Sequence, residues 1–135
     1  MTYAIRYYTR TGHTKQLADA FSEVLGVPAE TTKTALSEPC DILFFGGGLY
    51  AASLDANIKS FIDSLNPELI GKAVLFTSSA INSGVYGKMR KALEARGIKV
   101  EDDNFYCKGA FKFIAAGHPD DEDIAAAKEF ARKYA

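Results

Sequence analysis

Three threonines and one glycine stand close together near the start of the chain, in residues 7–14, which read YYTRTGHT. Threonine hydroxyls donate hydrogen bonds, and Gly12 permits backbone conformations that a side chain would forbid. A single threonine here would be interpreted as part of an ordinary helix start, with Thr11 or His13 as the cap and Gly12 in a turn. Three threonines around a glycine instead indicate a phosphate site.

The surroundings of this segment favour the phosphate interpretation. An apolar run precedes it and an amphipathic helical pattern follows, so the helix would direct its unpaired N–H groups and the positive end of its dipole toward the segment. The segment contains neither GxxxxGK[ST] nor GxGxxG, the motifs of ATP-binding and dinucleotide-binding loops. Neither ATP nor a dinucleotide is therefore implied.

Two later apolar runs also end in small residues. Residues 46–48 are three glycines after the run 42–45. Consecutive glycines at the end of a strand usually mark a close approach of the backbone, although a plain flexible turn would explain them too. The polar stretch 77–83 follows the run 74–76 in the same way. Such a stretch is common after a strand, so this third signal is weak by itself.

The elements that must position these segments alternate between strand and helix. Strands are expected over residues 3–8, 27–32, 41–46, 72–77 and 99–107. Amphipathic helices are expected from about 14 to 25, 54 to 65, 85 to 96 and 120 to 134, with at most one helical turn over 34–38. This alternation predicts an α/β fold, a doubly wound five-stranded parallel sheet with helices on both faces. Ligands of such sheets bind beyond the carboxyl ends of the strands.

Length and composition predict one domain over residues 1–135, with 47% apolar and 24% charged residues. The sequence has no apolar run long enough to span a membrane and no secretory signal pattern, so we expect a cytoplasmic protein that does not bind a membrane. Cys40 and Cys107 form no CxxC pair, and no metal site is expected. The 17 acidic and 16 basic residues are scattered along the chain, which argues against a nucleic-acid surface.

The apolar strand, the pattern T-x-T-G-x-T and the amphipathic helix together resemble the phosphate loop of the flavodoxins and their flavodoxin-like relatives. Family members read like G-S-P-x-Y-W-G-S in the second loop, and Tyr50 falls on the shared tyrosine. The resemblance covers nearly the whole chain, and residues 105–109 and 117–120 resemble a group of short bacterial members. It implies the strand order 2-1-3-4-5 and FMN as cofactor.

The resemblance also implies which positions bind FMN. The first loop would hold the phosphate, the second would lie against the flavin, and the third would hold the pyrimidine edge of the isoalloxazine. The positions carried over are Thr9, Arg10, Thr11, Gly12, His13, Thr14, Gly47, Gly48, Leu49, Tyr50, Ala51, Thr77, Ser78, Ser79 and Asn82. No residue must act as an acid or a base, so no catalytic residue is named.

The implied function is that of an FMN-binding flavoprotein in electron transport, or of a small flavin-dependent oxidoreductase acting on a quinone or a protein partner. The chain departs from the family at Ala51, where an aromatic residue often stacks on the flavin, so that Tyr50 or Tyr86 would have to cover a ring face. Ala52 replaces a common glycine, and the net charge is only −1. The last two departures weaken the interpretation as a pure one-electron carrier.

Two alternatives come from other functional classes. A receiver-type regulatory domain would have the same strand order, but it needs an acidic pair after the first strand and an Asp at the end of the third. This chain has threonine and glycine at those places. A flavodoxin fold that has lost its cofactor and serves as a binding module is the other alternative, and the intact segment 7–14 argues against it.

Overall fold

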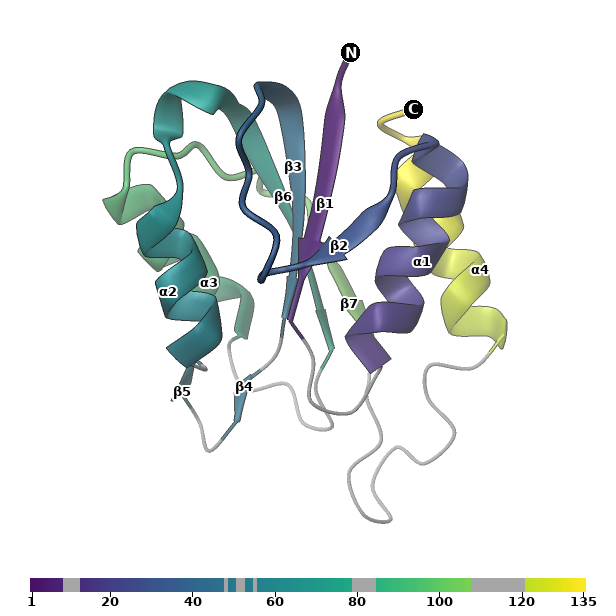
Figure 1. Cartoon of the computed structure of the whole chain (residues 1–135). Coiled ribbons are helices and arrows are strands. Elements are labelled where there is room, and N and C mark those ends of the chain that lie inside the picture. Colours follow the sequence, from purple (N-terminus) through teal and green to yellow (C-terminus); the bar gives the residue numbers. More distant parts are fainter. Residues whose placement is uncertain (9–12, 48, 51–52, 55, 79–84, 108–120) are drawn as a thin grey trace.

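Short apolar runs form the strands of a five-stranded parallel sheet in the computed structural model of the chain (Figure 1). The structure describes residues 1–8, 13–47, 49–50, 53–54, 56–78, 85–107 and 121–135. The strands of this sheet are β1 (Tyr3–Tyr7), β2 (Ala29–Thr31), β3 (Cys40–Gly47), β6 (Ile70–Ser78) and β7 (Phe105–Cys107). They lie in the order β2-β1-β3-β6-β7, so the predicted order 2-1-3-4-5 is confirmed.

Four α-helices cover the two faces of this sheet (Figure 1). The first face carries α1 (His13–Leu25) and α4 (Asp121–Arg132), and the second carries α2 (Ala56–Ser64) and α3 (Val85–Ala95). A short 3₁₀ helix, η1 (Pro67–Leu69), follows α2, and the side chain of Asn66 caps it by accepting a hydrogen bond from the Glu68 backbone N–H at 3.1 Å. No helix among the described ranges has both the length and the apolar character needed to cross a membrane.

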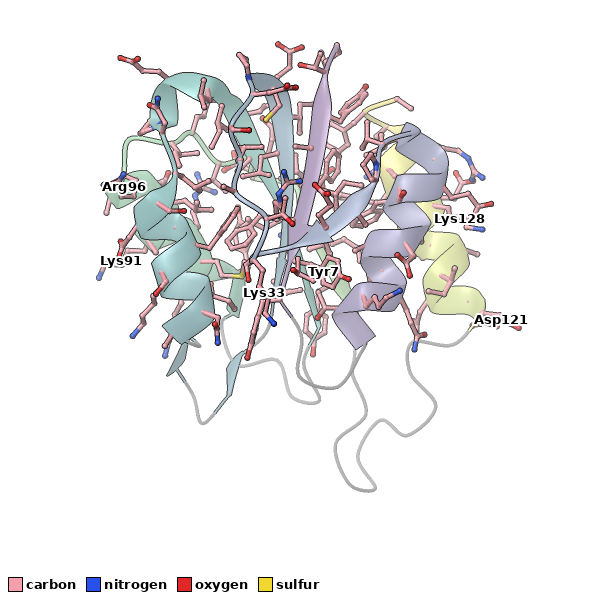
Figure 2. The ribbon with its side chains drawn as sticks, in the orientation of Figure 1. Tyr7, Lys33, Lys91, Arg96, Asp121 and Lys128 are labelled. Carbon is pink, nitrogen blue, oxygen red and sulfur yellow. The ribbon has the colours of Figure 1, made fainter. Side chains whose placement is uncertain are left out.

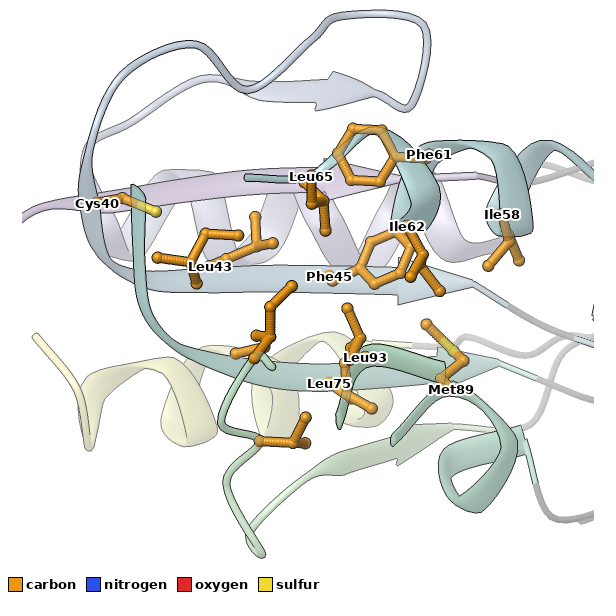
Figure 3. Close-up of a cluster of buried hydrophobic side chains, with 14 residues drawn as sticks. Cys40, Leu43, Phe45, Ile58, Phe61, Ile62, Leu65, Leu75, Met89 and Leu93 are labelled. Atoms are coloured by element: carbon orange, nitrogen blue, oxygen red, sulfur yellow. The ribbon is translucent and has the colours of Figure 1, made fainter. Parts of the chain in front are cut away.

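The buried side chains form one hydrophobic cluster on each face of the sheet. On the first face, Phe21 of α1 meets Phe76 of β6 edge to face, with ring centroids 4.7 Å apart. On the second face, Phe45 of β3 packs against Phe61 of α2 at 5.3 Å (Figure 3). Because neighbouring residues of a strand point to opposite faces, β3 needs apolar residues at every position of its central part. This explains the continuous run 42–45.

The connection between β2 and β3 contains no helix and crosses the second face as an extended segment, residues 32–39 (Figure 1). Arg6 of β1 holds it in place from a side chain that is almost fully buried. Its guanidinium donates hydrogen bonds to the backbone carbonyls of Thr34 at 3.0 Å and Ala35 at 3.3 Å, and it pairs with Glu30 at 3.2 Å. A buried charge needs such partners, and here they tie the segment to the sheet.

The last predicted strand is wrong over part of its length. Residues 99–101 exchange backbone hydrogen bonds with Ala73, but the chain then leaves the sheet, and β7 begins only at Phe105. Two acidic side chains of this stretch bind bases outside it, Glu101 to Lys72 at 3.3 Å and Asp102 to Arg90 at 2.6 Å. The residues between Glu101 and β7 are Asp102, Asp103 and Asn104, which are types disfavoured in strands, and this explains the interruption.

The predicted start of the second helix is also wrong. Residues 53–54 do not open α2 but form β5 (Ser53–Leu54), which pairs antiparallel with β4 (Leu49–Tyr50). Strands of two residues are too short to show the alternation by which a strand is recognised in a sequence. Part of the segment expected to be a loop is therefore a small β-ribbon at the end of β3.

A glycine of β3 makes room for a ring of the first-face cluster. Gly46 pairs with Phe76 in the sheet, and a Cβ atom on Gly46 would lie 2.1 Å from the Phe76 ring. We expect Gly46→Ala to lower the free energy of unfolding in urea by about 1–3 kcal/mol, because the ring must leave its rotamer. Adding Phe76→Leu to this variant should recover part of the loss.

Gly87→Ala is the matched control. A Cβ atom on Gly87, in α3, would meet nothing within 4 Å. This variant should be as stable as the wild type or up to about 1 kcal/mol more stable, because alanine favours the helix. A Gly46→Ala protein that unfolds at the wild-type urea concentration would show that the contact with Phe76 does not constrain this position.

Candidate functional site

The carboxyl ends of β1, β3 and β6 lie level with one another at one edge of the sheet. Tyr7 pairs with Gly46, Gly47 pairs with Thr77, and the Tyr8 N–H donates to the Gly46 carbonyl at 3.0 Å. β1 and β3 are neighbours, yet the helices that follow them cover opposite faces of the sheet. A ligand crevice is expected at such a reversal of winding, so this edge is the candidate site.

The first predicted segment begins and ends at this edge. Thr9, Arg10, Thr11 and Gly12 lie outside the described residues, but Tyr8 before them follows β1 and His13 after them opens α1. Thr14 is in the first turn of α1 and is only 2% exposed. That first turn contains no acidic residue, so no carboxylate competes for the positive end of the helix dipole.

The second predicted segment leaves the end of β3 and forms the β4–β5 ribbon. Leu49 and Tyr50 are β4 itself, whereas Gly48, Ala51 and Ala52 lie outside the described residues. A Cβ atom on Gly47 would lie 2.7 Å from Cδ1 of Ile58 in α2. The close approach predicted for these glycines therefore exists at Gly46 and Gly47, but the groups that approach them are side chains of the protein's own core.

The third predicted segment leaves the end of β6, next to β3. Thr77 is 1% exposed and Ser78 is the last residue of the strand. Ser79 and Asn82 lie outside the described residues. The described residues continue from Val85, where α3 begins (Figure 1). The described residues around all three predicted segments thus meet at the same edge.

A network that sequence reasoning missed fixes the start of α3. The Tyr86 hydroxyl donates to the Glu101 carbonyl at 2.7 Å, and Arg90 donates to the Tyr86 hydroxyl at 2.8 Å. The Asp102 carboxylate and then the Tyr86 hydroxyl raise the pKa of Arg90, which stays charged. The spacing of Tyr86 and Arg90 fits a helical i,i+4 pair, but nothing in the sequence indicates the partners at 101–102. The proposed cover of a flavin ring by Tyr86 stays a prediction.

Cys40, the cysteine whose side chain the structure describes, lies away from this edge, whereas Cys107 ends β7 beside Ser78. Cys40 stands at the first residue of β3, at the opposite end of the strand from Gly47. Burial raises the pKa of its thiol, which therefore stays protonated. Within the described ranges no three His, Cys, Asp or Glu side chains gather to hold a metal ion.

Comparison with known sequences decides the family. A sequence model described as a flavodoxin domain matches residues 4–113, from β1 through all three segments of the candidate site to beyond β7. The chain belongs to the flavodoxin family. An uncharacterized protein of Methanocaldococcus jannaschii is 29% identical to this family member, over 70% of this chain and 69% of that protein.

Solved structures agree with the fold of this flavodoxin-family protein. A flavodoxin from the domain Archaea has a TM-score of 0.75 at 15% identity, covering 98% of this chain and 95% of that one. Oxidised Flavodoxin 2 from Bacillus cereus has a TM-score of 0.75 at 19% identity, covering 99% and 97%. The rubredoxin oxygen:oxidoreductase of Desulfovibrio gigas reaches 0.75 at 13%, covering 96% of this chain but 34% of that one.

The Tyr86 network should contribute measurably to stability. Tyr86→Phe removes one donated and one accepted hydrogen bond, so we expect the free energy of unfolding to fall by about 0.5–1.5 kcal/mol. In a double-mutant cycle, Tyr86→Phe and Arg90→Met should couple by at least about 0.5 kcal/mol. Combining Tyr86→Phe with Lys91→Met is the control and should be additive, whereas additivity in both pairs would dismiss the network.

Proposed function

We propose that this flavodoxin-family protein binds FMN at the carboxyl ends of β1, β3 and β6 and acts in electron transfer or as a small flavin-dependent oxidoreductase. The observation that carries the proposal is that the strand ends from which the three predicted segments leave lie level with one another at the point where the winding reverses. The flavodoxin-domain match spans all three segments and supports it.

The chemistry of the described residues fits a phosphate beside α1. The first N–H groups of α1 have no partner within the helix, by the geometry of any helix start, and the first turn contains the buried Thr14 and no acidic side chain. Thr9, Arg10, Thr11, Gly12 and His13 would complete the phosphate site. A helix dipole and neutral hydroxyls hold a phosphate without burying a compensating lysine.

The second and third segments would hold the isoalloxazine ring. Gly47, Gly48, Leu49, Tyr50 and Ala51 would lie on one side of it, with the backbone of the glycines close to the ring and Tyr50 as a candidate to cover a ring face. The pyrimidine edge would be bound by Thr77, Ser78, Ser79 and Asn82. When bound, FMN supplies the redox chemistry, and the protein supplies binding, orientation and control of access by water and partners.

We further propose that residues 1–135 form one domain that works in the cytoplasm with a redox partner protein or a quinone-type molecule. Both hydrophobic clusters pack on the same sheet, which supports a single folding unit. We name no catalytic residue, because electron transfer to or from a bound flavin needs no acid or base from the protein.

The phosphate site can be tested by removing hydroxyl groups. Thr14→Val keeps the volume of a buried side chain, and the double variant Thr11→Val, Thr14→Val removes two donors to the phosphate. Each charge-assisted hydrogen bond is worth about 1.5–3 kcal/mol, so the dissociation constant for FMN should rise at least about tenfold. Quenching of flavin fluorescence measures it.

Riboflavin, which lacks the phosphate, makes this test specific. Its affinity should be weaker than that of FMN in the wild type and should not change in the double variant. Thr2→Val, at an exposed threonine before the amino end of β1 and so at the opposite end of the sheet from the candidate site, should bind FMN like the wild type. If the wild type does not bind FMN at all, the alternative of a flavodoxin fold serving as a binding module without cofactor replaces this proposal.

A further inference from the structure

The net charge of the chain is close to zero, but acidic and basic residues are unevenly distributed between the helices on the two faces of the sheet. The helices of the first face, α1 and α4, carry three bases and six acids. The helices of the second face, α2 and α3, carry four bases and two acids, and residues 96–103 after α3 add two bases and three acids. Charges that are scattered along the sequence are thus partly sorted between the two faces of the folded chain.

The bases of the second face lie on its outer surface. Lys59 of α2 and Lys88 and Lys91 of α3 are exposed. Figure 2 shows Lys91 and Arg96 on the outer flank of the molecule, on the side away from α4. Among the described residues Lys59 and Lys91 form no ion pair, whereas on the first face Lys15 pairs with Asp19 at 2.8 Å and Lys128 with Glu23 at 2.9 Å. Arg90 of the same surface pairs with Glu94 at 3.4 Å and Asp102 at 2.6 Å, so the positive charge without an ion pair among the described residues comes from Lys59 and Lys91.

The two helices of this surface are held together and begin near the candidate site. Arg96 donates to the Leu65 carbonyl just after α2 at 2.8 Å, which links the far ends of α2 and α3. Lys88 is in the first turn of α3, and α3 begins at the edge where the third segment ends (Figure 1). The exposed residues of α2 near Lys59 are short, namely Ala56, Asn57, Ser60 and Ser64. Lys59 is therefore surrounded on α2 mainly by short side chains, and Lys88 lies near the end of the helix that borders the proposed flavin site.

We propose that this basic surface, formed by Lys59, Lys88, Lys91 and the exposed faces of α2 and α3, docks a small acidic electron-transfer protein. The proposal rests on the proposed function, because the surface adjoins the proposed flavin site. A basic patch on a nearly neutral protein attracts an acidic partner and orients it before contact, mainly by raising the rate of association. Asp63 and Glu94 lie within the same surface. These two carboxylates can pair with scattered bases on a partner protein, but they would repel the phosphates of a nucleic acid.

The test measures binding to a probe, an acidic plant-type [2Fe–2S] ferredoxin carrying a fluorescent label. Anisotropy gives its dissociation constant from the purified protein at about 20 mM and about 200 mM NaCl. The wild type should bind at low salt and lose at least about fivefold in affinity at high salt, because screening shortens the reach of exposed charges. Lys88→Glu with Lys91→Glu should weaken binding at low salt at least about tenfold.

A control variant with the same change of net charge distinguishes an effect of this surface from an effect of the total charge of the protein. Lys128→Glu with Lys133→Glu reverses two charges in or after α4 and should stay within about twofold of the wild type. Equal losses in both double variants, or none in either, would overturn the proposal. So would a short DNA duplex that binds more tightly than ferredoxin through the same two lysines.

The flavin is assayed separately on the same proteins. Both double variants should bind FMN like the wild type, because neither changes a residue of the proposed flavin site. If FMN does not bind to any of them, the proposed function fails while the ferredoxin titration still decides the docking surface. If FMN binds and the two lysines have no effect on ferredoxin binding, only the docking surface fails.

Discussion

The double-sided burial of β3 is the constraint on which the rest of this structure depends. Ile42 and Phe44 face α1 and α4, whereas Leu43 and Phe45 face α2 and α3, so this strand fills both clusters. Its place between β1 and β6 brings three carboxyl ends to one level. At the carboxyl end of β3 the residues are glycines. Phe76 and Ile58 occupy the space that side chains at Gly46 and Gly47 would need. The same packing that completes the two hydrophobic clusters therefore requires glycines at the end of β3, next to the candidate site.

Arg6 binds the extended connection between β2 and β3, where no helix covers the sheet. An extended segment over a sheet has backbone carbonyls that need partners, and it offers little apolar surface of its own. The Arg6 guanidinium supplies those partners at Thr34 and Ala35, and Leu36 packs on the second-face cluster. The Arg6 hydrogen bonds and the packing of Leu36 thus hold this segment against the sheet, as the apolar face of a helix would do elsewhere. Removing the Arg6 guanidinium would destabilise the fold, because the backbone carbonyls that it binds would lose their hydrogen-bond donor.

Most of the fold was predictable from the sequence because its signals are local. Runs such as 42–45 and 74–76 have the composition of buried strands, and the stripes of α1 and α3 have the period of helices. The strand order and the candidate flavin residues depended instead on resemblance to a family. The β4–β5 ribbon, the packing role of Gly46 and the ion pair of Arg90 with Asp102 were not predictable. Each depends on residues that only the folded chain brings together.

The lengths of the strands also bear on how readily the edges of the sheet can pair with another chain. β3 and β6, with eight and nine residues, lie inside the sheet and have both sides paired. The outermost strands, β2 and β7, have three residues each. An unpaired strand edge is a template on which another sheet can extend, and short edges offer few N–H and C=O groups to it. The aggregation-prone apolar runs are thus shielded by neighbours that are themselves poor templates for fibril growth.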